Sequence, residues 1–162
     1  CFKSLPTISA QTLSTMDIAS LEAKNISYYT AVGNKAMVQG GKVSGGEWID
    51  TIRFRDWLKT EIQSKVLNLF LGLSKVPFTD QGIALVQNAV IDALEEGVRA
   101  GGIVQEASSE DGEATQSYTV TVPRAADLDA ATRKSRKLTG VTWSAQLAGA
   151  LIAAKIGGTL NY

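Results

Sequence analysis

The sequence of 162 residues contains no histidine and only one cysteine, Cys1. Without histidine there is no usual general base at neutral pH, no imidazole metal ligand and no Ser–His or Cys–His nucleophile pair. One cysteine forms neither an internal disulfide nor a cysteine-based zinc site. An excess of one charge is also missing, because 16 Lys and Arg balance 16 Asp and Glu. Nucleic-acid binding favours strongly basic domains, so the balanced charge leads us to expect no nucleic-acid partner. The missing histidine and the single cysteine lead us to expect no metal, and we also expect no cofactor.

Long hydrophobic runs are absent as well. The longest apolar stretches, around Val66–Leu73 and Leu147–Ala154, fall well short of the roughly 20 residues that span a bilayer, so no membrane partner is expected. The chain begins with Cys1 and has neither a basic leader nor a long apolar one. We therefore expect residues 1–162 to be one domain from the C-terminal portion of a longer chain.

Two long amphipathic helices are predicted in the middle of the sequence. The first runs from Trp48 to about Gly72, and the second is capped by Thr79 or Asp80 and ends at Gly101-Gly102. The apolar stripe of the first helix consists of Leu58, Ile62, Val66, Leu69, Phe70 and Leu73. Shorter helices are predicted within residues 12–24 and within 125–137, the latter beginning at Asp127.

Strand patterns flank these helices on both sides. Residues 26–32 are rich in β-branched and aromatic side chains, and the turn dipeptide Gly33-Asn34 predicts a hairpin with residues 36–39. Residues 118–122 and 141–147 alternate between apolar and polar side chains. The pattern predicts an α+β fold, in which the two amphipathic helices cover a small mixed or antiparallel sheet.

Two loops invite a ligand-binding interpretation that their residues do not support. Gly40-Gly41-Lys42 resembles part of a phosphate-binding loop, but Ala36 stands where glycine is needed and Val43 where Ser or Thr is needed. Residues 106–116 combine acidic residues with serine and glycine but lack the ligand order of a calcium loop. We predict a flexible loop at the first and an exposed acidic loop at the second.

Three carboxylates near tryptophans raise the alternative of a hydrolase. Glu47, Asp50 and Asp56 lie close to Trp48 and Trp57 in the sequence, and paired carboxylates perform glycoside hydrolysis. Such a pair needs a cleft and separated pKa values, which a sequence does not show. Charges at the start of a helix, favoured by the helix dipole, are the simpler interpretation, and we expect no enzyme.

The strongest charged feature is the basic run at Arg133, Lys134, Arg136 and Lys137. Three interpretations stay open: a solvated helix end, where cations are favourable, a surface that docks an acidic protein, and a nucleic-acid contact. The third ranks last, because no aromatic stacking platform lies nearby in the sequence.

The C-terminal stretch suggests a partner strand. Residues 141–162 are apolar, punctuated by glycine and protected by only one charge, Lys155. Monomers usually protect an edge strand with charges or prolines. We therefore expect residues 150–162 to be a linking arm that completes a sheet of another subunit.

Several motifs resemble the tail sheath proteins of contractile-tailed bacteriophages. The segments that carry the resemblance are Gly46-Glu47-Trp48-Ile49-Asp50, Arg55-Asp56-Trp57-Leu58, Val76-Pro77-Phe78-Thr79-Asp80-Gln81-Gly82-Ile83, the stretch from Leu138 to Leu151, and Ile156-Gly157-Gly158-Thr159-Leu160. Their order and spacing agree with that family from about Leu21 to the end.

The resemblance implies a structural subunit near the tail tube of a virion. Family members form stacked six-fold rings of sheath subunits around the tube, meet a baseplate and contract to drive the tube through the host envelope, which leads to genome ejection. Such a subunit would assemble in the host cytoplasm. Leu151, Ile152, Ile156 and Leu160 would then link subunits. Arg53, Arg55 and Lys59, or Arg133, Lys134, Arg136 and Lys137, are candidate tube contacts by their charge.

Overall fold

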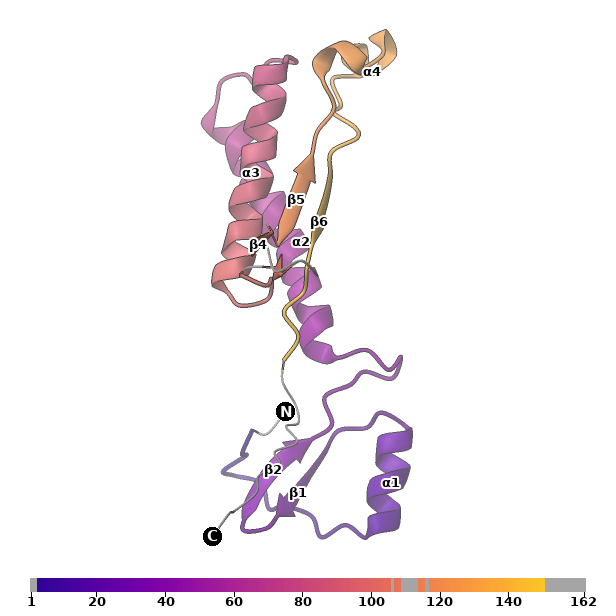
Figure 1. Cartoon of the computed structure of the whole chain (residues 1–162). Coiled ribbons are helices and arrows are strands. Elements are labelled where there is room, and N and C mark those ends of the chain that lie inside the picture. Colours follow the sequence, from indigo (N-terminus) through magenta and orange to yellow (C-terminus); the bar gives the residue numbers. More distant parts are fainter. Residues whose placement is uncertain (1–2, 106, 109–113, 116, 151–162) are drawn as a thin grey trace, which may run out of the picture. The chain divides into compact units, whose positions relative to one another are not determined.

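The computed structural model describes residues 3–105, 107–108, 114–115 and 117–150 (Figure 1). The chain divides into two compact units, which are described separately below. The first contains the described residues up to Arg53 together with Gly149 and Ala150, and the second comprises Phe54–Ala148. Apart from Ala150, the expected linking arm lies outside the described residues.

A short helix of the first unit begins at a complete capping box. Helix α1 (Thr15–Ala23) follows Ser14, whose Oγ accepts a hydrogen bond from the backbone N–H of Asp17 at 3.2 Å. In return, the Ser14 N–H donates to Oδ2 of Asp17 at 3.0 Å. The Ser14 hydroxyl also donates to Oδ2 of Asp17 at 2.7 Å, and this bond, followed by that from the Ser14 N–H, holds the pKa of the Asp17 carboxyl below its usual value. No residue of α1 is buried, so local hydrogen bonds and not burial stabilise its first turn.

The predicted hairpin is present in the first unit. Strands β1 (Tyr28–Val32) and β2 (Lys35–Gln39) pair antiparallel, with Val32 opposite Lys35. The two-residue turn between them places Gly33 at a φ of 60°, a region that disfavours side chains. Glycine at the first central position matches the twist of a two-residue hairpin turn.

Two helices form one layer of the second unit (Figure 1). Helix α2 (Ile49–Gly72) and helix α3 (Asp80–Arg99) are joined by a loop that contains Pro77. Thr79 caps α3, because its Oγ1 accepts a hydrogen bond from the N–H of Gly82 at 3.3 Å. Gly82 must be glycine, since a Cβ there would collide with the carbonyl oxygen of Pro77.

The core of the second unit lies between the helices and a strand pair. Strand β5 (Tyr118–Thr121) pairs antiparallel with β6 (Thr142–Ala145). The buried cluster consists of Leu58, Val90, Leu94 and Ile103, and the half-buried residues around it are Phe54, Ile62, Val66, Val98, Tyr118, Val120 and Ala145. Both helices therefore contribute an apolar face to the β5–β6 pair, as the sequence predicted.

The fold is α+β, which confirms the predicted class, but the strands do not join into one sheet. A further pair of two-residue strands, β3 (Ala107–Ser108) and β4 (Ala114–Thr115), lies within the predicted acidic loop. The described strands form three separate antiparallel pairs, none of them mixed. One reason is that β1–β2 and β5–β6 belong to different units.

The predicted start of the last helix, at Asp127, is wrong. A 3-10 turn (Ala125–Asp127) precedes helix α4 (Ala130–Ser135), and Asp129 is the capping residue. Its carboxylate accepts a hydrogen bond from the backbone N–H of Thr132, which lowers the pKa of Asp129. Arg136 ends the helix in a left-handed conformation with a φ of 55°. No helix in the described ranges combines the length and apolarity needed to cross a membrane.

Candidate functional site

The three carboxylates considered for hydrolysis do not meet in a cleft. Glu47, Asp50 and Asp56 are all exposed, and Asp50 lies in the first turn of α2, where the helix dipole favours it. Asp56 lies 3.9 Å from Nε of its neighbour Arg55, and both side chains are mostly solvated. None of the three lines a pocket described below, so the hydrolase alternative gains no geometric support.

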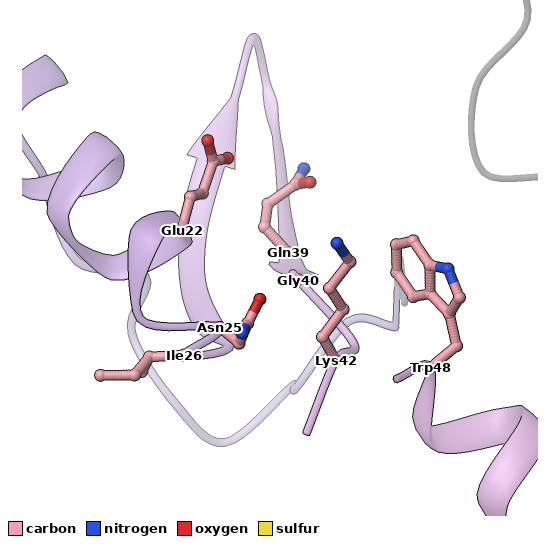
Figure 2. Close-up of a pocket in the computed structure, with 7 residues that line it drawn as sticks. All are labelled: Glu22, Asn25, Ile26, Gln39, Gly40, Lys42 and Trp48. Carbon is pink, nitrogen blue, oxygen red and sulfur yellow. The ribbon is translucent and has the colours of Figure 1, made fainter. Parts of the chain in front are cut away.

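The loop after β2 forms one wall of a pocket in the first unit (Figure 2). The pocket has a volume of about 310 Å³, and its lining residues are Glu22, Asn25, Ile26, Gln39, Gly40, Lys42 and Trp48. The ammonium of Lys42 lies 5.1 Å from the centre of the Trp48 ring, a cation–π distance. Since Lys42 is engaged with this ring and Glu22 adds a carboxylate, the loop lacks the features of a phosphate cradle.

The basic residues predicted on the first long helix are exposed but do not form one patch. Residues four apart share a helix face, so Arg55 and Lys59 lie on the same side of α2. Arg53 comes two residues before Arg55 and therefore lies almost opposite on the helix. Only Arg55 and Lys59 are brought together.

The second basic run is concentrated at one end of the second unit. Arg133, Lys134, Arg136 and Lys137, hereafter the basic end, are all exposed. Within the described part of the chain, none of these four side chains forms an ion pair. Arg136 and Leu138 border an apolar groove of about 90 Å³, whose other lining residues are Phe70, Val76, Pro77, Phe78, Gly82, Ile83 and Val86. The geometry is compatible with a solvated helix end and with a docking surface.

The apolar stripe of α2 is buried only over its first half. Leu58 is buried, whereas Phe70 and Leu73 are 53% and 42% exposed, against the expectation for this stripe. Leu67 and Leu71, outside the predicted stripe, are exposed as well. Periodicity identified the apolar face but could not show how far the packing partner reaches along it.

A charge network that sequence reasoning missed connects α2 to α3. Nζ of Lys65 lies 3.3 Å from Oε2 of Glu96 and 3.6 Å from Oε1 of Glu61, and Arg99 reaches Glu96 at 3.3 Å. Hydrogen bonds from Lys65 and then Arg99 hold the pKa of the Glu96 carboxyl below its usual value, and Glu96 raises the pKa of Lys65. The spacing of Glu61 and Lys65, four residues apart on a predicted helix, was the available signal.

The β2 side of the β1–β2 hairpin offers an open backbone position. The two-residue turn makes Val32 and Lys35 a hydrogen-bonded pair, and alternation then directs the backbone groups of Ala31 and Ala36 outward. The next outward-facing pair, Tyr29 and Val38, already has partners. The Tyr29 carbonyl accepts a hydrogen bond from the Gln11 N–H, and the Val38 N–H donates to the Lys3 carbonyl. On β1, Gln11 forms a parallel bridge with Thr30, so the edge of this strand beside Ala31 is occupied. Among the described residues, Ala36 on β2 has no such partner, so a further strand has a donor and an acceptor to pair with there.

The predicted linking residues Leu151, Ile152, Ile156 and Leu160 lie outside the described residues. Over the ranges that the structure describes, no three Asp, Glu or Cys side chains approach closely enough to hold a metal ion.

Comparison with known proteins identifies a family and a likeness of fold. The sequence profile of the family described as E217 tail sheath protein gp31-like, C-terminal domain, matches residues 49–160. No curated protein gives a significant match. A cryo-EM structure of the anti-feeding prophage (AFP) helical sheath in contracted state is similar over 97% of this chain, with a TM-score of 0.68 and 15% identity. The chain spans 43% of that sheath chain, and at this identity the likeness shows the fold alone.

Proposed function

Since the chain belongs to the family of E217 tail sheath protein gp31-like C-terminal domains, we propose that it is a subunit of a contractile phage tail whose copies stack as six-fold rings around a tail tube. The family match over residues 49–160 carries this proposal, because it includes all of α2, α3, α4 and the β5–β6 pair. The likeness to a contracted helical sheath supports it through the fold. The role is structural and not enzymatic.

Contraction in this proposal draws on a metastable assembly, since Gly40-Gly41-Lys42 lacks the residues of a nucleotide-binding loop. Subunits move as near-rigid bodies, the tube is driven through the host envelope and the genome is ejected. The subunit assembles in the host cytoplasm, meets the tube and the baseplate, and remains in the tail of the virion.

The proposed link between subunits is strand addition. The arm at 150–162, with Leu151, Ile152, Ile156 and Leu160, would pair with an open sheet edge of a neighbour. The outward backbone groups of Ala36 on β2 offer such an edge. Glycine at positions 149, 157 and 158 would allow the arm to bend while the backbone hydrogen bonds persist.

The proposed tube contacts are the two basic clusters. Polar contacts suit a surface that must release the tube during contraction, because salt and water weaken them more than they weaken an apolar seal. Arg55 and Lys59 share a helix face, so they are the stronger pair in the first cluster. Arg53, on the opposite side of α2, is the weaker candidate.

Truncation tests the link between subunits. A chain ending at Ala150 should retain the thermal unfolding midpoint of the second unit, whose core residues all precede this position. It should fail to form the rings or tubes that the intact chain forms under the electron microscope. Assembly of the truncated chain at the wild-type protein concentration would rule out the arm as the link.

Neutralising the basic clusters tests the tube contact separately. Glutamine at all seven basic positions should abolish attachment of the sheath to purified tail tubes, while glutamine at the exposed Lys24 and Lys35 serves as the matched control. Unchanged attachment of the first variant would exclude both clusters as tube contacts.

A further inference from the structure

An apolar groove and a group of cations meet at one end of the second unit. The walls of the groove come from the end of α2, the loop that follows it, the start of α3 and the residues that end α4. Phe70, on one wall, is 53% exposed, and Leu67, one turn earlier on α2, is 57% exposed. A groove of about 90 Å³ with such open apolar surface suits one bulky apolar side chain of a partner.

Positive charge surrounds this groove. The basic end supplies four exposed cations, one of which, Arg136, lines the groove itself. Lys75 is exposed too and directly precedes the lining residue Val76. Among the described residues, neither Lys75 nor any side chain of the basic end forms an ion pair. The charge of these side chains is therefore available to a partner.

The carboxylates in this part of the chain leave the cations in excess. Asp80, in the first turn of α3, accepts a hydrogen bond from the backbone N–H of Ala125 at 2.6 Å. Asp129 accepts one from the backbone N–H of Thr132 and caps α4, and Asp127 is the third carboxylate between residues 80 and 137 on this side of the fold. The charge of the surface is therefore complementary to an acidic partner.

The backbone of Arg136 is unusual for a residue that has a side chain. It ends α4 with a φ of 55° and a ψ of 27°, a left-handed conformation that glycine adopts without cost and other residues do not. Residues held in such conformations cluster at functional sites. Here the conformation goes with a side chain that lines the groove, which points to a binding role for that side chain.

We propose that the groove and the basic end together bind an acidic segment of another protein, with one bulky apolar side chain of that segment in the groove and carboxylates on either side of it paired with the cations. The planar guanidinium groups of Arg133 and Arg136 suit bidentate recognition of these carboxylates. The inference goes beyond the proposed function, because it gives the chemistry of a partner and does not depend on assembly into a sheath.

A separate acidic protein fits this surface better than a second copy or a nucleic acid does. On α2 and α3 of this chain, three carboxylates already lie 3.3–3.9 Å from a cation of the same chain, and these are Asp56, Glu61 and Glu96. A second copy would offer these groups only at the loss of those pairs. Contacts to phosphates gain nothing from an apolar groove, and the whole chain has no net charge to attract a nucleic acid.

Fluorescence anisotropy with labelled synthetic peptides tests the inference in the intact chain. One peptide has a single phenylalanine flanked on both sides by glutamates. A second has alanine in place of the phenylalanine, and a third has glutamine in place of each glutamate. The protein variants are Arg136→Gly and, as a matched control that removes one cation elsewhere, Lys35→Gln at an exposed position of β2. Circular dichroism gives the thermal unfolding midpoint of each variant.

We expect the first peptide to bind the wild-type chain at least about tenfold more tightly than either of the others, because each of those lacks one of the two kinds of contact. Arg136→Gly should weaken this binding at least about fivefold. Its unfolding midpoint should stay the same or rise, because glycine relieves the left-handed backbone. This combination separates a binding role of Arg136 from a structural one. Lys35→Gln should bind the first peptide as the wild type does.

Several results would overturn the inference. It is wrong if the first peptide does not bind, if it binds no better than the alanine or the glutamine peptide, or if Arg136→Gly binds it as tightly as the wild type. A labelled single-stranded oligonucleotide that binds more tightly than the first peptide and loses affinity in Arg136→Gly would make the surface a nucleic-acid site instead. Self-association that Arg136→Gly weakens, measured by sedimentation velocity, would make a second copy the occupant. None of these results contradicts the proposed function, which depends on assembly around a tube.

Discussion

The ring of Phe54 occupies the space that a side chain on Gly102 would need, and three of its carbons would collide with a Cβ at that position. Phe54 also packs against the buried cluster around Leu94, so the ring cannot move away without disturbing the core. Gly102→Ala should therefore lower the free energy of unfolding by about 1–3 kcal/mol, the usual cost of overpacking. Urea denaturation of the purified chain measures this loss.

Gly72→Ala is the matched control for this substitution. Gly72 ends α2, and a Cβ there would meet no atom within 4 Å. Its effect should be near zero or slightly stabilising, because alanine favours the helix. Equal stabilities of the two variants would show that Phe54 does not fill this space.

Leu94 should be the most sensitive apolar position of the second unit. Its side chain is 0% exposed and lies in the buried cluster between the helices and β5–β6. Leu94→Ala should cost about 2–5 kcal/mol through lost burial and the cavity it leaves. Leu71→Ala removes the same atoms from a side chain that is 74% exposed and should cost less than about 0.5 kcal/mol. Comparable thermal shifts for the two variants would contradict the location of the core.

The capping box of α1 predicts a dependence on pH. Because hydrogen bonds from Ser14 lower the pKa of Asp17 in the folded state, their stabilisation is present above the ordinary carboxyl pKa and disappears as the pH falls through the lowered value. Ser14→Ala should raise the pKa of Asp17 in an NMR titration. It should also accelerate amide exchange in α1 roughly fivefold. Ser20→Ala, on the exposed middle of the helix, should leave the pKa of Asp17 unchanged.

Strand addition at the hairpin edge predicts a change in amide protection on assembly. Met37 pairs with Thr30 within the hairpin, whereas the backbone groups of Ala36 point outward. Hydrogen exchange at Ala36 should slow at least about tenfold in the assembled protein, since an added strand would accept its N–H. Exchange at Met37 should change little. If Ala36 exchanges at its monomer rate in the assembly, another edge receives the arm.

Much of the fold could be predicted because its elements depend on local signals. The period of apolar residues located α2 and α3, Thr79 or Asp80 was predicted to cap α3 and Thr79 does so, and Gly33-Asn34 specified the hairpin. The family suggested by the sheath-like motifs is confirmed by the profile match. These features could be predicted because a few neighbouring residues determine caps, turns and helical periods.

The features that escaped prediction depend on contacts between distant residues or on a choice between similar neighbours. Lys65 and Glu96 lie 31 residues apart, and their pairing follows from how α2 and α3 pack. The outward groups of Ala36 follow from the strand register, which composition does not reveal. Asp127 and Asp129 are equally good caps in isolation, and the 3-10 turn that precedes α4 decides between them.

Cryo-EM of the assembled tail particle tests the central claim, that this chain is a sheath subunit, most directly. The account predicts a helical layer of stacked six-fold rings around a central tube, into whose repeating density the second unit fits, with α3 and the β5–β6 pair resolved. A tail in which this chain is absent from that layer, or a particle that contains it only as an isolated subunit, would contradict the account.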